Sequence, residues 1–156
     1  DGPARLAEAR RRRPGGSAAE LVGDAETYLK FERPSLEFAD AVRRLGRDVF
    51  AYRFDWQSPM VGLDSGHCLE LPFVFNNPDA WTGSPMLAGA DPAALAGLGN
   101  AMQSAWAAFV KTGRPQAEAV PDWPPYDETT RLTMCFDDIV AAVADPAGVG
   151  RSRREI

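Results

Sequence analysis

Hydrophobic and polar residues alternate with a period of two in one stretch of the chain. Residues 48–56 read "DVFAYRFDW", in which the aromatic side chains are separated by Ala51, Arg53 and Asp55. This period predicts a strand with one aromatic face. Residues 131–136, "RLTMCF", predict a second, shorter strand late in the chain.

Elsewhere the apolar residues recur at helical spacing. Helices are predicted over residues 3–13, from Ser17 up to Pro34, from Pro34 to Gly46, and from Pro92 to Gly113. Ser17 and Glu20 have the spacing of a capping box, and Asp91 suits the residue before a helix that begins with proline.

Three segments separate or follow these elements. Residues 57–66, "QSPMVGLDSG", predict a loop because of their Ser, Pro and Gly content. The apolar run at residues 69–75 fits either a buried strand or a helical turn by pattern alone. Residues 139–156 are expected to form a loose tail.

The two predicted strands cannot form a stable sheet by themselves, because the aromatic face needs to be covered and the strands need further partners. The sheet is therefore expected to be incomplete on its own.

Composition and charge restrict the function classes. The 156 residues are 45% hydrophobic with a net charge of −5, which argues against a general nucleic-acid binder. Two basic clusters, Arg10–Arg13 and the terminal "RSRREI", are better interpreted as a helix end and a solvated tail. No apolar run reaches the roughly 20 residues that span a bilayer, so no membrane partner is expected.

The two cysteines, Cys68 and Cys135, match no metal-binding or redox spacing and are expected to be free thiols. A zinc site built from both cysteines and His67 would lack a fourth ligand and would use two adjacent residues. The sequence therefore predicts neither a metal nor a cofactor.

His67 is the only histidine in the chain. A structural role beside the apolar run that follows it is one interpretation. The other is catalysis, because His67 lies on a loop after the strongest strand and histidine titrates near neutral pH. A catalytic histidine needs a nucleophile, and no Gly-x-Ser-x-Gly elbow occurs in this chain. The residues alone leave both interpretations open.

Four blocks of sequence, taken in order, favour the catalytic interpretation of His67. They read "VFAYRFDW", "GHCLELPFVFNN", "MQSAWAAFVKTGRP" and "WPPYDETTRLTMCFD". In that order they resemble the C-terminal part of the type-B carboxylesterases, which include the cholinesterases and the bacterial para-nitrobenzyl esterases. The resemblance covers about residues 20–138 and is closest to the bacterial branch. Asn76 stands where the family commonly has glycine.

The resemblance implies an α/β fold, the C-terminal portion of an α/β-hydrolase domain comprising its last strands and flanking helices. Residues 1–156 would form one segment of a single domain. His67 matches the position of the family's triad histidine. Glu70 matches an acidic position of the motif and is expected to be either a buried carboxylate near the site or a partly buried surface glutamate. Residues 69–75 would then be a helical turn. Neither Asp55 nor Asp64 matches the triad acid.

The function implied is hydrolysis of small-molecule carboxylic esters by a serine esterase, in which His67 is the general acid and base. The nucleophile, the acid and the oxyanion hole would lie on a preceding portion or a companion chain, so this chain alone is expected to be inactive. A non-catalytic interaction module derived from the esterase fold is the alternative. The expected location is the cytoplasm.

Overall fold

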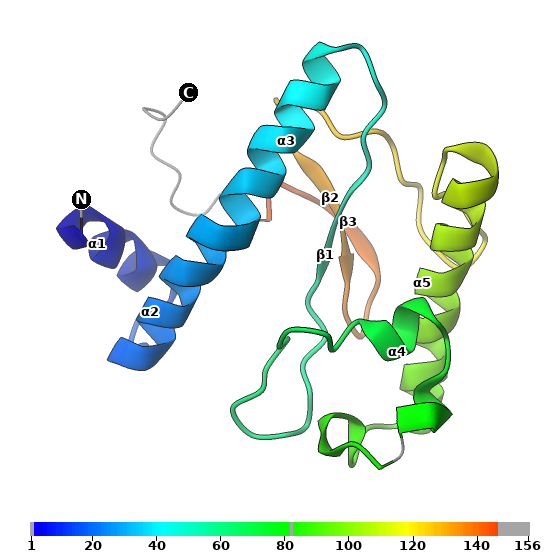
Figure 1. Cartoon of the computed structure of the whole chain (residues 1–156), viewed down its shortest axis with the longest axis horizontal. Coiled ribbons are helices and arrows are strands. Elements are labelled where there is room, and N and C mark those ends of the chain that lie inside the picture. The colour runs from blue at the N-terminus through cyan, green and yellow to red at the C-terminus, as the bar shows by residue number, and fades with distance from the viewer. Residues whose placement is uncertain (1, 82, 147–156) are drawn as a thin grey trace. The chain divides into compact units, whose positions relative to one another are not determined.

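The structure of the chain is a computed structural model that describes residues 2–81 and 83–146. Its elements fall into two compact units (Figure 1). The described residues up to Val49, together with residues 127–131 and 145–146, belong to the first unit. Residues 50–126 and 132–144 contain the second unit, in which the sheet and His67 are found. No helix among the described residues is long and apolar enough to cross a membrane.

The first unit is helical. Its elements are α1 (Gly2–Arg12), α2 (Ala18–Thr27), the π-helical turn η1 (Tyr28–Glu32) and α3 (Arg33–Arg44). The predicted capping box is confirmed, since the Ser17 hydroxyl accepts the Glu20 N–H and the Glu20 carboxylate accepts the Ser17 N–H. Arg13, just after α1, pairs with Glu20 and Asp24 of α2 at 3.1 and 3.0 Å. The end of α1 is thereby held against α2.

Pro34 does not separate two helices, as the sequence predicted, because α2, η1 and α3 form one continuous helical run. Proline has no N–H to donate four residues back. The run widens just before it into η1, where the Arg33 N–H donates to the Tyr28 carbonyl five residues back. The Ser35 hydroxyl donates to the Phe31 carbonyl at 2.7 Å. The wider turn therefore absorbs the proline without ending the helix.

The sheet of the second unit has three strands in the order β1–β2–β3. They are β1 (Ala51–Phe54), β2 (Leu132–Phe136) and β3 (Ala141–Ala144). β1 runs parallel to β2 with Tyr52 opposite Met134, and β3 returns antiparallel to β2. Both predicted strands are confirmed, although β1 is shorter than expected. Residues 141–144, which the sequence predicted to lie in a loose tail, form β3 instead. Residues 147–156 of that predicted tail lie outside the described part.

The helical elements of the second unit are α4 (Leu71–Val74), the 3₁₀ turns η2 (Pro78–Trp81) and η3 (Pro85–Leu87), and α5 (Pro92–Thr112). The helical turn expected within residues 69–75 is confirmed as α4. The Asp91 carboxylate accepts the Ala93 N–H at the start of α5, and Gly113 ends the helix with φ 75°. This left-handed conformation is the one that glycine adopts most readily.

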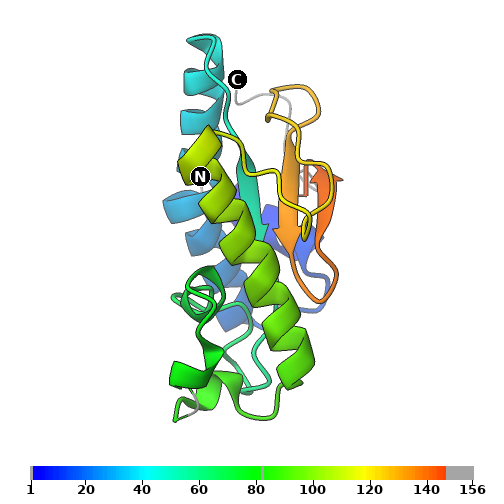
Figure 2. The same cartoon turned by 90° about the vertical axis from the view of Figure 1, so that its right-hand side faces the viewer.

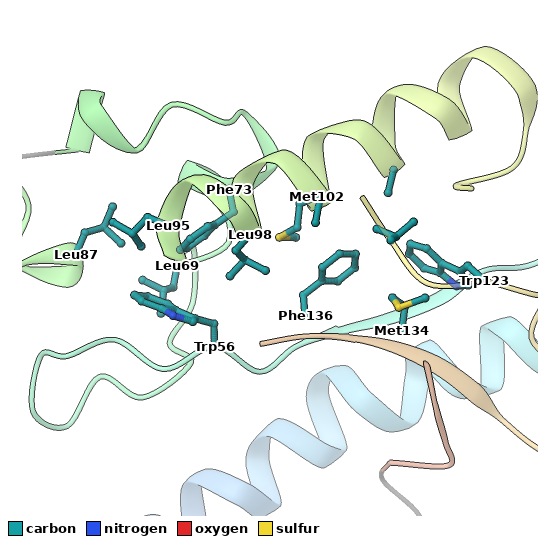
Figure 3. Packing of buried hydrophobic residues seen from close by; sticks show 13 residues of the cluster. Trp56, Leu69, Phe73, Leu87, Leu95, Leu98, Met102, Trp123, Met134 and Phe136 are labelled. Carbon is teal, nitrogen blue, oxygen red and sulfur yellow. The ribbon is translucent and has the colours of Figure 1, made fainter. Parts of the chain in front are cut away.

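The core of the second unit lies between α5 and one face of the sheet (Figures 2 and 3). In Figure 3, Phe136 of β2 lies next to Met102 of α5, and Met134 of β2 lies next to Trp123. Trp56, at the end of β1, packs on Phe73 of α4 with ring centroids 5.1 Å apart. This core fixes both the end of β1 and the start of α4, which are the two elements that flank His67.

Candidate functional site

The end of β1 is a rigid starting point for the site. The backbone N–H groups of Asp55 and Trp56 both donate to the Phe136 carbonyl of β2, at 2.8 and 3.1 Å. Trp56 is 6% exposed and belongs to the core. The chain therefore leaves the sheet from a backbone that is bonded to β2 and packed from one side.

The loop that follows, residues 57–66, closes on itself before it reaches His67. The Ser58 N–H donates to the Asp64 carbonyl at 3.0 Å, and the Ser58 hydroxyl donates to the Met86 carbonyl at 2.6 Å. At the returning end, the Ser65 hydroxyl lies 2.8 Å from the Asp55 carbonyl and 2.9 Å from the Trp56 carbonyl. The loop thus returns to the strand end from which it started.

His67 occupies a tight turn between this loop and α4. The Leu69 N–H donates to the Gly66 carbonyl at 3.2 Å, which makes Gly66–Leu69 a β-turn. Cys68, the third residue of the turn, has φ 69° while His67 has no positive φ, and this combination defines a type II turn. A Cβ on Gly66 would lie 2.9 Å from the Leu63 carbonyl oxygen, a backbone atom that cannot easily move aside, so glycine is favoured there. The turn presents the His67 side chain to solvent.

The imidazole of His67 has no polar partner among the described residues. Among residues 2–81 and 83–146, no hydrogen bond or ion pair of the His67 ring is found. Asp55 is paired with Arg53 at 2.6 Å, and Asp64 is exposed on the loop with φ 47°. The resemblance excluded both aspartates as the triad acid, and nothing in this geometry assigns them that role.

Glu70 is partly buried and directly precedes α4. Its backbone carbonyl accepts N–H groups from Phe73 and Val74, at 3.1 and 2.9 Å, and its side chain makes no capping bond. Burial raises the pKa of the Tyr52 hydroxyl, and the nearby negative charge of Glu70 raises that pKa further. The negative charge of Glu70 therefore lies near enough to the Tyr52 hydroxyl to disfavour its ionisation.

The cysteines give no metal site. Cys68 and Cys135 are both free, and the described residues contain no group of three His, Cys, Asp or Glu side chains that could hold a metal ion. Burial raises the pKa of the Cys135 thiol to about 11. Cys135 is thus a protonated core thiol at neutral pH.

Three large apolar residues near His67 in the sequence differ in their exposure. Phe73 is fully buried and packs on Phe54 as well as Trp56, so it is a core residue. Met60 is 44% exposed on the loop, and Trp81 is partly buried at the end of η2. Sequence patterns do not reveal the role of Ser65, because the acceptors of its hydroxyl lie nine and ten residues earlier in the chain.

Asn76, where the sequence departs from the common glycine of the family, has φ 47°. This left-handed conformation favours glycine, and asparagine is among the few other residues that adopt it readily. The Asn76 side chain also donates to Gln103 Oε1 of α5 at 3.2 Å. The substitution therefore preserves the backbone path after α4.

Comparison with known proteins gives a consistent result. The sequence model of the carboxylesterase family matches residues 6–144. The chain is 38% identical over 128 residues to phenmedipham hydrolase of Pseudarthrobacter oxydans, covering 81% of this chain and 25% of that protein. It is 39% identical over 129 residues to para-nitrobenzyl esterase of Bacillus subtilis, again covering 81% of this chain and 25% of the relative. The chain therefore spans about a quarter of the length of these relatives.

Solved structures agree with the sequence comparison. A carboxylesterase of Geobacillus stearothermophilus at pH 6.2 superimposes with a TM-score of 0.80 and 26% identity, covering 96% of this chain and 32% of that one. A thermophilic PNB esterase has a TM-score of 0.70 and 35% identity, covering 90% of this chain and 28% of that one. The chain belongs to the carboxylesterase family, and its elements form a portion of the α/β-hydrolase fold of that family.

Proposed function

We propose that this chain supplies the catalytic histidine, His67, of a serine carboxylesterase that hydrolyses small-molecule carboxylic esters. The observation that carries the proposal is the position of His67, exposed in a tight turn beyond the carboxyl end of β1. β1 is paired in parallel with β2, and sites in open α/β sheets lie beyond the carboxyl ends of such strands. Two relatives of this chain are named for the hydrolysis of phenmedipham and of para-nitrobenzyl esters.

The chemistry assigned to His67 is proton transfer. When a serine hydroxyl attacks the ester carbonyl, the neutral imidazole accepts the proton, and the O–H bond of the serine breaks as its C–O bond forms. When the tetrahedral intermediate collapses, the imidazolium returns the proton to the oxygen of the departing alcohol. Water then repeats both steps on the acyl-enzyme.

Other groups of the mechanism belong to a part of the enzyme outside this chain. No Gly-x-Ser-x-Gly sequence is present, and the relatives are about four times as long as the matched segment. We assign the nucleophile, the triad acid and the oxyanion hole to that preceding portion or companion chain. Glu70 lies three residues after His67 and is partly buried. We propose that its carboxylate lies near the site and stabilises it without contacting the substrate.

The test uses the active enzyme that contains this chain and short-chain p-nitrophenyl esters. His67→Ala is expected to lower kcat by a factor of about 10⁴ or more, as typical losses of a triad member do. Lys111→Ala, in the last turn of α5, is the control and is expected to retain activity. A fluorophosphonate probe is expected to label a serine outside these 156 residues.

Two results would contradict the proposal. Activity that survives His67→Ala would remove the catalytic assignment and favour a non-catalytic role for this chain. A phosphonylated serine within residues 1–156 would show that the nucleophile does not lie elsewhere.

A further inference from the structure

The hydroxyl of Ser65 joins the segment that carries His67 to the end of β1. Ser65 lies two residues before His67, and its Oγ is 2.8 Å from the Asp55 carbonyl and 2.9 Å from the Trp56 carbonyl. A serine hydroxyl has one proton, so the two carbonyls share it in a three-centre bond. The bond crosses the whole loop, because its acceptors lie nine and ten residues earlier in the chain.

The two acceptors are themselves fixed. Their residues, Asp55 and Trp56, donate both backbone N–H groups to the Phe136 carbonyl of β2. The Trp56 side chain packs on Phe73 in the core. A hydrogen bond to these carbonyls therefore holds Ser65 against a backbone segment that is itself bonded to β2 and packed in the core.

On the other side of His67, the chain is anchored by packing. Leu69 is fully buried in the core, and the turn from Gly66 to Leu69 spans only four residues. His67 thus lies between two anchors, the Ser65 hydroxyl before it and the Leu69 side chain after it. Without the Ser65 hydroxyl, the next bond back along the chain is the one from the Ser58 N–H to the Asp64 carbonyl, three residues before His67.

We propose that Ser65 is a positioning residue, whose hydroxyl sets the place of the His67 imidazole relative to the end of β1. The inference rests on the proposed role of His67 in ester hydrolysis. Ser65 touches no reacting atom and acts only through His67. Small displacements of a catalytic group reduce proton transfer sharply, because the reacting atoms must be aligned to within a fraction of an ångström.

A positioning role has a chemical signature that a purely structural role lacks. An alkoxide leaving group must receive a proton from the imidazolium as the C–O bond breaks, whereas p-nitrophenolate is stable enough to leave without one. A displaced imidazole therefore slows the hydrolysis of an ethyl ester more than that of the p-nitrophenyl ester of the same acid. A smaller fraction of folded enzyme would slow both equally.

The experiment compares Ser65→Ala, Ser65→Thr and Ser35→Ala in the active enzyme that contains this chain, using the ethyl and p-nitrophenyl esters of one acid. The loss of one typical hydrogen bond from a transition state lowers a rate constant about fivefold. Ser65→Ala is expected to lower kcat for the ethyl ester by about five- to tenfold with KM unchanged, and by less for the p-nitrophenyl ester. Ser65→Thr keeps the hydroxyl at an exposed position and is expected to retain activity.

Ser35→Ala is the matched control, because the Ser35 hydroxyl also donates to a backbone carbonyl at an exposed position but lies on α3. It is expected to leave both rates unchanged. Equal losses for the two esters after Ser65→Ala, or no loss at all, would overturn the positioning role while His67→Ala still abolished activity. Full activity in His67→Ala would overturn the proposed function itself, and the role of Ser65 with it.

Discussion

The two units of the chain use their apolar side chains in different ways. In the second unit the large apolar residues form one core, in which Phe73, Met102, Met134 and Phe136 are fully buried. In the first unit Phe31, Phe38 and Leu45 are 64, 70 and 78% exposed. Phe31 lies in η1, Phe38 in α3 and Leu45 directly after α3. Because they are seven residues apart, they lie on one side of the helical run and form an apolar stripe.

Polar contacts have a larger share in the first unit. Arg44 pairs with Glu128 at 2.9 Å, and Arg131 approaches Asp40 at 3.8 Å. An exposed pair such as Arg44–Glu128 contributes roughly 0–1 kcal/mol, whereas the side chains of Arg131 and Asp40 are only 17 and 15% exposed. The second unit therefore has its own source of stability, whereas the first presents an apolar stripe of the kind that marks a contact surface.

The largest expected effect is on the core of the second unit. Phe136 is fully buried and lies 5.8 Å, ring to ring, from both Trp106 and Trp123. Phe136→Ala is expected to lower the free energy of unfolding by about 3–5 kcal/mol, because it leaves a large cavity. Phe38→Ala is the matched control on the exposed stripe and is expected to change it by no more than about 0.5 kcal/mol.

Urea unfolding of this chain, followed by tryptophan fluorescence, measures both values. Similar losses for the two variants would show that the contrast between the units is wrong. The same substitution can also be measured in the enzyme that contains this chain. If Phe38→Ala lowers the free energy of unfolding more there than in the chain alone, the stripe is covered in the enzyme.

The sequence predicted those features that depend on local patterns. The capping box at Ser17, the start of α5 at Pro92 and the end of α5 at Gly113 follow from short-range chemistry, and all three are confirmed. The strand character of β1 and β2 followed from their alternation and their β-branched or aromatic content. The resemblance, rather than periodicity, identified residues 69–75 as a helical turn.

The features that the sequence did not predict depend on distant partners. β3 is a run of small residues, "AAVA", whose strand state comes from its pairing with β2. The helix continues past Pro34 because a π-helical turn forms before the proline, and periodicity does not reveal such a turn. Ser65 was overlooked because its acceptors, the carbonyls of Asp55 and Trp56, are brought near only by the closed loop.

The next effect in size tests whether the second unit supports backbone strain beside His67. Cys68 has φ 69°, where a β-branched residue is strongly disfavoured. Cys68→Val is expected to lower the free energy of unfolding by about 1–2 kcal/mol. Cys68→Gly removes the strain but adds freedom to the unfolded chain, so it is expected to remain within about 1 kcal/mol of the wild type.

The same substitution at the other cysteine is the control for this comparison. Cys135 lies in β2, where valine fits the backbone, so Cys135→Val is expected to cost less than Cys68→Val. Urea unfolding midpoints of the three variants provide the measurement. Equal costs at both cysteines would mean that the turn at Cys68 is not strained.

The smallest expected effect lies in the first unit and depends on pH. Hydrogen bonds from the hydroxyl and the backbone N–H of Ser17, with a contribution from Arg13, lower the pKa of the exposed Glu20 carboxylate below its ordinary value. A carboxylate whose pKa is lowered by folding stabilises the folded state above its unfolded pKa, and this contribution is lost as the pH falls through the folded pKa. Between pH 6 and 3, at about the ordinary glutamate pKa and below it, the wild type is therefore expected to lose more stability than Glu20→Gln. Urea unfolding at several pH values measures this difference in stability. Ser17→Ala is expected to reduce the difference, because it removes one partner of the Glu20 carboxylate. Parallel curves of stability against pH for the wild type and Glu20→Gln would contradict a role for the capping box in the acid sensitivity of this unit.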